Sequence, residues 1–145
     1  MISDSVRVAE SGRRKVRAVV ALVTASVRKV APFDPTRRYS PDEMEPYDAL
    51  SDRFVRAVEV CIRFFRSYEG LVEAGNSDTL RDLLLRMEKL KVIAETPLWL
   101  EMRDVRNRIV HDYLPEQLRD LYGLLTGRFH DELVATVAKI DAVRL

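Results

Sequence analysis

Cysteine is nearly absent from this chain of 145 residues, and Cys61 is the single one. A disulfide within the chain and a zinc site built from several cysteines are therefore excluded. Cys61 stands in the apolar stretch 58–65, where a buried thiol is a better interpretation than a nucleophile. Histidine is also rare, with two in the chain, and no Gly-rich phosphate loop is present. We expect no metal site and no cofactor.

Long apolar runs are lacking as well. No stretch approaches the roughly 18 apolar residues that a membrane-spanning helix requires, and the first residues lack the basic-then-apolar order of a secretory signal. We therefore expect no membrane partner and a cytoplasmic location. With 47% hydrophobic and 32% charged residues, the composition is typical of amphipathic helices around a core.

Glycine is scarce, with five residues, and no segment alternates apolar and polar residues with the period of a strand. Apolar residues instead recur at helical spacing. Ser40-Pro41-Asp42-Glu43 is a capping box with proline at the first helical position, and Thr96-Pro97 predicts a second capped start. The predicted helices cover about residues 11–30, 41–74, 78–92, 97–112 and 115–143. This pattern predicts an all-α, five-helix up-and-down bundle in a single domain of residues 1–145.

Positive charge gathers at the start of the chain. Residues 1–40, the predicted first helix and its loop, hold 9 basic and 3 acidic residues, while the whole chain has a net charge of +1. A basic segment of this kind can attract RNA or an acidic partner. It can also be a solvated helix face that folds against the acidic remainder, and the sequence leaves both interpretations open.

The predicted fourth helix has polar groups opposite its apolar stripe. Asp104, Asn107 and His111 follow one another at i, i+3 and i+7. They lie on the side away from the predicted apolar stripe, which consists of Leu98, Met102, Val105 and Ile109. A core-facing helix needs only one apolar stripe, yet this outer side mixes polar groups with apolar ones. The mixture favours a second contact surface or a site. The alternative is that these groups only cap the helix and form salt bridges.

Arg106 and His111 are five residues apart, which places them about 140° apart around one helix. They can face one substrate atom if Arg106 reaches round, if the helix loosens near His111, or if a second copy supplies part of the site. We favour a homodimer whose cleft lies between two copies of this helix, with Trp99 and Val110 also near the two-fold axis. On a continuous helix, Tyr113 would lie directly above Arg106.

The segment Arg106-Asn107-x-x-Val110-His111-Asp112-Tyr113 resembles the signature of HEPN domains in its R-N-x-x-V/A-H-x-Y form. That form is similar to the HepT-like toxins encoded beside a minimal nucleotidyltransferase (MNT) antitoxin. Stretches 82–90 and 99–104 also resemble the branch described as nucleotidyltransferase substrate-binding proteins. The resemblance covers about residues 47–145 and leaves residues 1–40 unexplained.

The resemblance implies a metal-independent ribonuclease that uses the RNA 2′-hydroxyl as nucleophile. His111 would then be the general base or acid, since an imidazole titrates near neutral pH. Arg106 would bind the scissile phosphate, and Asn107 would orient His111 or bind RNA. We add from the spacing alone that Asp104 could hold the imidazole tautomer.

The resemblance also implies a protein partner, because Tyr113 stands where the paired antitoxin transfers AMP. The favoured hypothesis is thus an endoribonuclease toxin neutralised by AMPylation. One alternative is a non-catalytic helical protein that binds a nucleotidyltransferase and presents a substrate to it, and another is a plain dimerisation module. We interpret His130 as a structural histidine.

Overall fold

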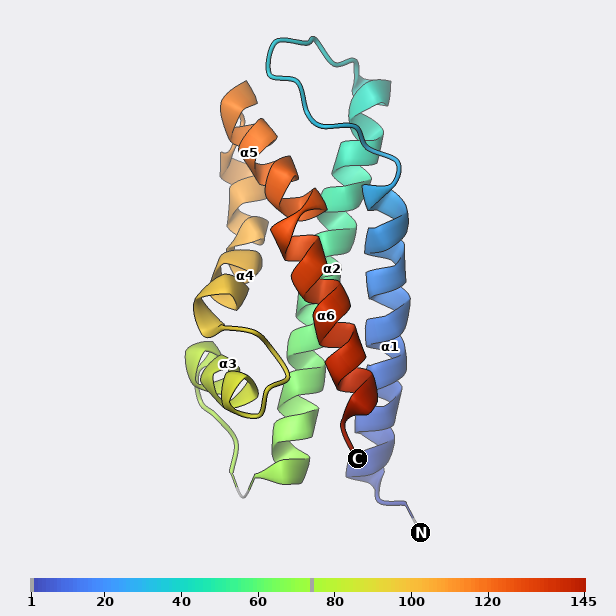
Figure 1. Cartoon of the computed structure of the whole chain (residues 1–145), viewed down its shortest axis with the longest axis vertical. Helices are drawn as coiled ribbons and strands as arrows, with labels where there is room; N and C mark the ends of the chain where they lie inside the picture. The colour runs from blue at the N-terminus through green and yellow to red at the C-terminus, as the bar shows by residue number, and fades with distance from the viewer. Residues whose placement is uncertain (1, 74) are drawn as a thin grey trace.

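The computed structural model describes residues 2–73 and 75–145, and this part of the chain consists of helices and loops (Figure 1). It contains six helices and no strand, arranged as a helical bundle. The helices are α1 (Asp4–Val27), α2 (Pro41–Val72), α3 (Leu80–Lys89), α4 (Thr96–His111), α5 (Pro115–Thr126) and α6 (Arg128–Ala142). The expected all-α class is confirmed, and four of the predicted helices are found with shifted ends. None of these helices has the length and apolar character to cross a membrane.

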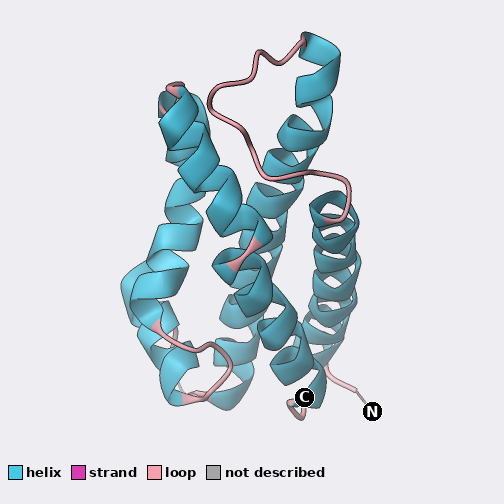
Figure 2. Cartoon of the chain, turned by 45° about the horizontal axis from the view of Figure 1, so that its top comes forward, coloured by secondary structure: helices cyan, strands magenta, loops and turns pink. Residues whose placement is uncertain are grey.

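The prediction of one continuous helix over about residues 115–143 is wrong. The structure divides this segment at Gly127 into α5 and α6. Figure 2 shows the break as a short loop between two helices that follow one another. A Cβ atom at Gly127 would lie 2.8 Å from the carbonyl oxygen of Gly123. The backbone approaches itself so closely here that a residue with a side chain could not take this conformation.

Two helix ends differ from prediction because nearby hydroxyls cap them. The Ser3 side chain accepts a bond from the Val6 amide, so α1 begins at Asp4 and not near residue 11. The Thr79 side chain accepts from the amide of Asp82, so α3 begins at Leu80. Such side-chain acceptors satisfy amides that the first turn of a helix leaves without partners.

The long helix α2 forms the centre of the bundle. Its start is the predicted capping box, in which Ser40 and Glu43 bind each other's backbone amides. Its core face carries large side chains that are almost fully buried, and α1, α3, α4 and α5 all contact it. Cys61 lies on this face, where burial raises the pKa of its thiol to about 12. The interpretation of Cys61 as a buried thiol is confirmed.

Helix α1 lies alongside α2 (Figure 1) and buries Val16, Val20 and Val23 against the core. Its basic residues partly turn towards α6: Arg17 Nε lies 2.6 Å from the carboxylate of Asp141. The basic segment therefore folds in part against an acidic group of the remainder, while many of its other charges face solvent.

A buried carboxylate ties the end of α2 to α3. Glu69 is 1% exposed and accepts bonds from the Ser77 amide at 2.8 Å, the Ser77 hydroxyl at 2.5 Å and Arg86 Nη1 at 3.0 Å. Burial by itself would raise the pKa of Glu69, but the bonds from Ser77 and the charge of Arg86 outweigh it. They hold the pKa of this carboxyl below its ordinary value of 4.5.

We predict that Glu69 contributes a pH-dependent part of the stability. Because its pKa is lower in the folded than in the unfolded chain, the contribution is complete above pH 4.5 and is lost as the pH falls through the folded value. Glu69→Gln should lower the free energy of unfolding by about 1–3 kcal/mol at neutral pH, and the difference from wild type should shrink in acid. Urea unfolding at a series of pH values measures this. Glu73→Gln, an exposed control at the end of α2, should change little, and equal effects of both substitutions would contradict the prediction.

Candidate functional site

Helix α4 is fixed at its start by two carboxylates. The amide of Thr96 donates to Glu88 Oε1 at 2.6 Å, and Glu132 Oε2 accepts from the Ala94 amide at 3.0 Å and from Trp99 Nε1 at 2.7 Å. The prediction that Thr96 caps the helix is wrong: Thr96 is the first helical residue and its amide is bound by Glu88. Glu88 and Glu132 were not recognised from sequence as the groups that hold this end.

The expectation that Trp99 lies on the outer side of α4 is also wrong. Trp99 is fully buried, and its ring meets Phe65 of α2 edge to face with centroids 5.1 Å apart. The physical reason is the indole N–H, which finds an acceptor in the buried Glu132, so the whole side chain can leave water. Trp99 therefore belongs to the core.

The buried stripe of α4 otherwise follows the sequence pattern. Leu98, Met102 and Val105 are buried, whereas Ile109, expected on the same stripe, is 37% exposed. The opposite side carries Asp104, Asn107 and His111, all exposed. The candidate residues therefore face solvent on the last turns of α4.

Arg106 points towards α2. Its Nη1 atom lies 3.4 Å from Glu59 Oε1, and Nη2 of Arg103 lies 3.5 Å from the same oxygen. Glu59 is a part of the site that the sequence analysis missed, because nothing in the local pattern of α2 marks it. One carboxylate thus faces two guanidinium groups, and the Arg106 side chain remains 62% exposed.

Asn107 and Asp104 bind each other, with Asn107 Nδ2 donating to Asp104 Oδ1 at 3.0 Å. Among the hydrogen bonds of the described residues, none joins Asp104 or Asn107 to His111. In a single chain, the structure therefore brings the two supporting residues together and leaves the imidazole apart from them.

The helix ends at His111, and the chain then turns away. The amide of Asp112 donates to the carbonyl oxygen of Arg108, while Arg108 Nε donates to Asp112 Oδ2 at 2.9 Å. Since α4 is helical from Arg106 to His111, loosening of the helix between them is not observed. Arg106 and His111 therefore lie about 140° apart around α4, as helical periodicity predicts.

Tyr113 lies beyond the helix, so the expected position above Arg106 on a continuous helix is wrong. The tyrosine is 78% exposed, and its ring does not pack in the core. Its amide and that of Leu114 both donate to Gln117 Oε1, at 3.2 and 3.1 Å. Gln117, also missed in the sequence, thereby holds the turn that connects α4 to α5.

Exposed apolar side chains flank His111 along the chain. Val110 is 75% exposed and Leu114 is 50% exposed, in addition to Tyr113 and Ile109. Such a concentration of exposed apolar groups within a few residues is typical of an interaction surface.

A cavity of about 380 Å³ lies beside Arg106, between α2 and α4. Its walls include Val55, Ile109 and the carboxylate-bearing residues Asp48 and Asp52. Two acids make the cavity unsuitable for a phosphate, so an anion that binds Arg106 would approach from the solvent side.

His130, the other histidine, is partly buried and lies 2.8 Å from the Thr24 hydroxyl of α1. Burial lowers the pKa of His130, an effect that nearby Asp131 opposes and Arg28 supports. Its surroundings agree with the interpretation of a structural histidine.

In comparisons with known proteins, no family model and no curated protein matches this chain.

Proposed function

We propose that this chain is a metal-independent endoribonuclease toxin of the HEPN type that a partner nucleotidyltransferase neutralises. The observation that carries the proposal is the exposure of Arg106 and His111 on the last turns of α4, within a set of exposed apolar residues. The R-N-x-x-V-H-x-Y spacing of the same segment is the second support. An imidazole can act as general acid or base, and an arginine can stabilise the charge of a phosphodiester in its transition state, without a metal.

In the proposed reaction, an imidazole takes the proton of the RNA 2′-hydroxyl, and the resulting oxygen attacks the adjacent phosphorus. The bond from phosphorus to the 5′-oxygen breaks, and that oxygen receives a proton from an acid. The products are a 2′,3′-cyclic phosphate and a free 5′-hydroxyl. Arg106 binds the phosphate and stabilises the negative charge that develops on it.

We further propose that the site is shared between two copies. Arg106 leans towards Glu59 of α2, whereas helical periodicity places His111 about 140° away around α4. A two-fold axis beside Val110 would bring the arginine of one copy near the imidazole of the other. Two His111 residues in one cleft would also supply both the base and the acid. The exposed apolar residues around His111 support a contact of this kind.

Tyr113 is the proposed point of control. Among the five tyrosines of the chain, it alone is exposed, since Tyr39 is partly buried and the other three are buried. A partner enzyme could therefore reach its hydroxyl. Transfer of AMP to that oxygen, with release of pyrophosphate from ATP, would place a negative charge next to the cleft and compete with RNA.

We predict cleavage of RNA in excess EDTA, with products that end in a 2′,3′-cyclic phosphate. His111→Ala and Arg106→Ala should each lower the rate about 100-fold or more, because each removes a group that acts in the transition state. Arg119→Ala, which removes an exposed arginine of α5, should keep the wild-type rate, and thermal unfolding should show all three variants folded.

Full activity in both site variants would refute the assignment. A wild-type chain that cuts no RNA but binds a nucleotidyltransferase would support the non-catalytic alternative.

We predict that Val110→Glu weakens self-association, because it places a charge in a contact that excludes water. Val134→Glu is the matched control, since Val134 is also exposed, at 46%, but lies on α6. Sedimentation at micromolar concentration should show a dimer for the wild type and the control, and a monomer for Val110→Glu. A wild-type monomer that still cuts RNA would rule out the shared cleft.

We predict that the cognate nucleotidyltransferase, given ATP, adds AMP to Tyr113 and stops cleavage. Tyr113→Phe should cut RNA at the wild-type rate and resist this inactivation, whereas Tyr39→Phe should still be modified. Mass spectrometry of the intact chain and of its peptides measures the transfer. If the wild-type chain gains no mass but still loses activity, neutralisation works by binding alone and the proposed modification is wrong.

A further inference from the structure

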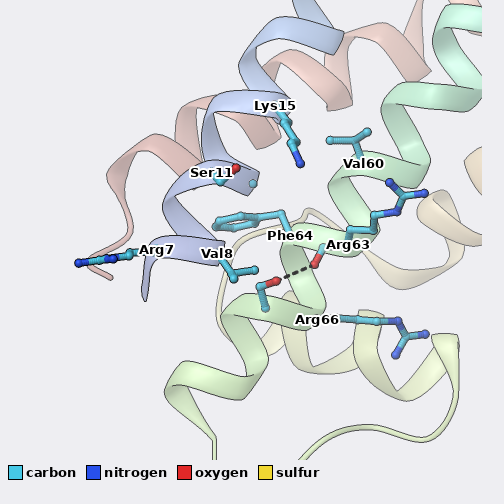
Figure 3. A pocket seen from close by; sticks show the side chains of 10 residues that line it. Arg7, Val8, Ser11, Lys15, Val60, Arg63, Phe64 and Arg66 are labelled. Atoms are coloured by element: carbon cyan, nitrogen blue, oxygen red, sulfur yellow. Dashed lines mark hydrogen bonds between the residues drawn. The ribbon is translucent and has the colours of Figure 1, made fainter. Parts of the chain in front are cut away.

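A groove of about 550 Å³ lies between α1 and α2, and its floor is apolar (Figure 3). Val8 of α1, which is 59% exposed, and Val60 of α2 line it, with the ring of Phe64 at its base. Helix α1 belongs to residues 1–40, which the resemblance to HEPN domains leaves unexplained. The groove therefore gives this segment a possible role that is separate from the site on α4.

Gly12 lets α1 lie close to Phe64 of α2 at the base of the groove. It stands inside α1, where glycine is the least favourable residue for a helix apart from proline. A Cβ atom at this position would lie 3.4 Å from Phe64 Cδ2, at the near edge of ordinary van der Waals contact. The packing of α1 on α2 therefore leaves room for alanine, whereas a larger side chain would have to displace Phe64.

Four cationic side chains surround this floor. Helix α1 supplies Arg7 and Lys15 along one side, and α2 supplies Arg63 and Arg66 along the other (Figure 3). All four are exposed, and none forms an ion pair with any residue that the structure describes. The groove thus combines an apolar floor with positive charge on both of its long sides.

We infer that this groove binds an amphipathic helix of a partner protein that carries acidic residues on both flanks of its apolar stripe. An apolar stripe would lie on the floor, as in other helix-in-groove complexes, and the acids would meet the cations on either side. Arg7 and Lys15 are eight residues apart, which corresponds to about 12 Å along α1, or roughly two turns of a docked helix.

The arrangement of the charges selects this occupant over others. A lipid or fatty acid has one anionic head, which would use the cations at one end only. The phosphates of RNA would use the cations but have no need of an apolar floor. An acidic amphipathic helix uses the floor and both rows of charge.

The test measures binding of a fluorescent synthetic helical peptide of about 15 residues, with leucine at i, i+3, i+4 and i+7 and glutamate on both flanks. A second peptide has lysine in place of every glutamate. The full chain should bind the glutamate peptide at least about tenfold more tightly than the lysine peptide. Fluorescence anisotropy measures both affinities.

Two variants test the floor and the rim separately. Val8→Asn makes the floor polar at an exposed position, and the double variant Arg63→Glu with Arg66→Glu reverses the charge on one side. Each should weaken binding of the glutamate peptide about tenfold or more. Arg81→Glu, which reverses an exposed charge on α3 outside the groove, should not. Thermal unfolding checks that each variant is folded, and the double variant alone decides the result if Val8→Asn does not fold.

Equal binding of the two peptides, or undiminished binding by the folded variants, would overturn the inference. Labelled single-stranded RNA and vesicles of anionic lipid serve as competing probes. If the double variant no longer binds the RNA or the vesicles but still binds the glutamate peptide, the groove is assigned to the ligand that was lost. None of these measurements uses cleavage, so the outcome is independent of the nuclease proposal.

Discussion

The buried carboxylate of Glu132 sets the rotation of α4 about its own axis, and the candidate site depends on that rotation. Glu132 accepts bonds from Trp99 Nε1 and from the Ala94 amide. A carboxylate that is 6% exposed would be costly without donors, so both bonds have to form when α6 packs against the start of α4. Once Trp99 is placed inside, helical periodicity directs Met102 and Val105 inwards as well.

The same rotation leaves Arg106 and His111 exposed on different sides of α4. Because the helix is continuous between them, about 140° of its circumference separates the two. Val110 lies between them by the same periodicity and is the most exposed aliphatic side chain of this region. An arrangement that separates two candidate catalytic groups within one chain, with an apolar residue between them, favours the proposed cleft between two chains over a site in one.

The features that sequence analysis could predict are those encoded by neighbours along the chain. The start of α2 is an example, since Ser40 and Glu43 are three residues apart and satisfy each other's backbone. The break at Gly127 escaped prediction because it depends on a close approach of the backbone to itself, which apolar periodicity does not record. Trp99 was misplaced because its hydrogen-bond acceptor, Glu132, is 33 residues away along the chain and its burial follows from that pairing. The candidate residues of α4 could be found from sequence, but the partners that hold them could not.

Glu59 is the clearest case of such a hidden partner, since 47 residues separate it from Arg106. Glu59 Oε1 lies 3.5 Å from Arg103 Nη2 and 3.4 Å from Arg106 Nη1, so one carboxylate forms ion pairs with two guanidinium groups. Ion pairs of this length at an exposed surface contribute little stability, whereas a phosphodiester can bind a guanidinium through two parallel hydrogen bonds. In the proposed nuclease, exchange of this carboxylate for an RNA phosphate would therefore cost little. In that proposal, Glu59 would hold Arg106 towards α2 before RNA binds and would not compete strongly with the phosphate afterwards.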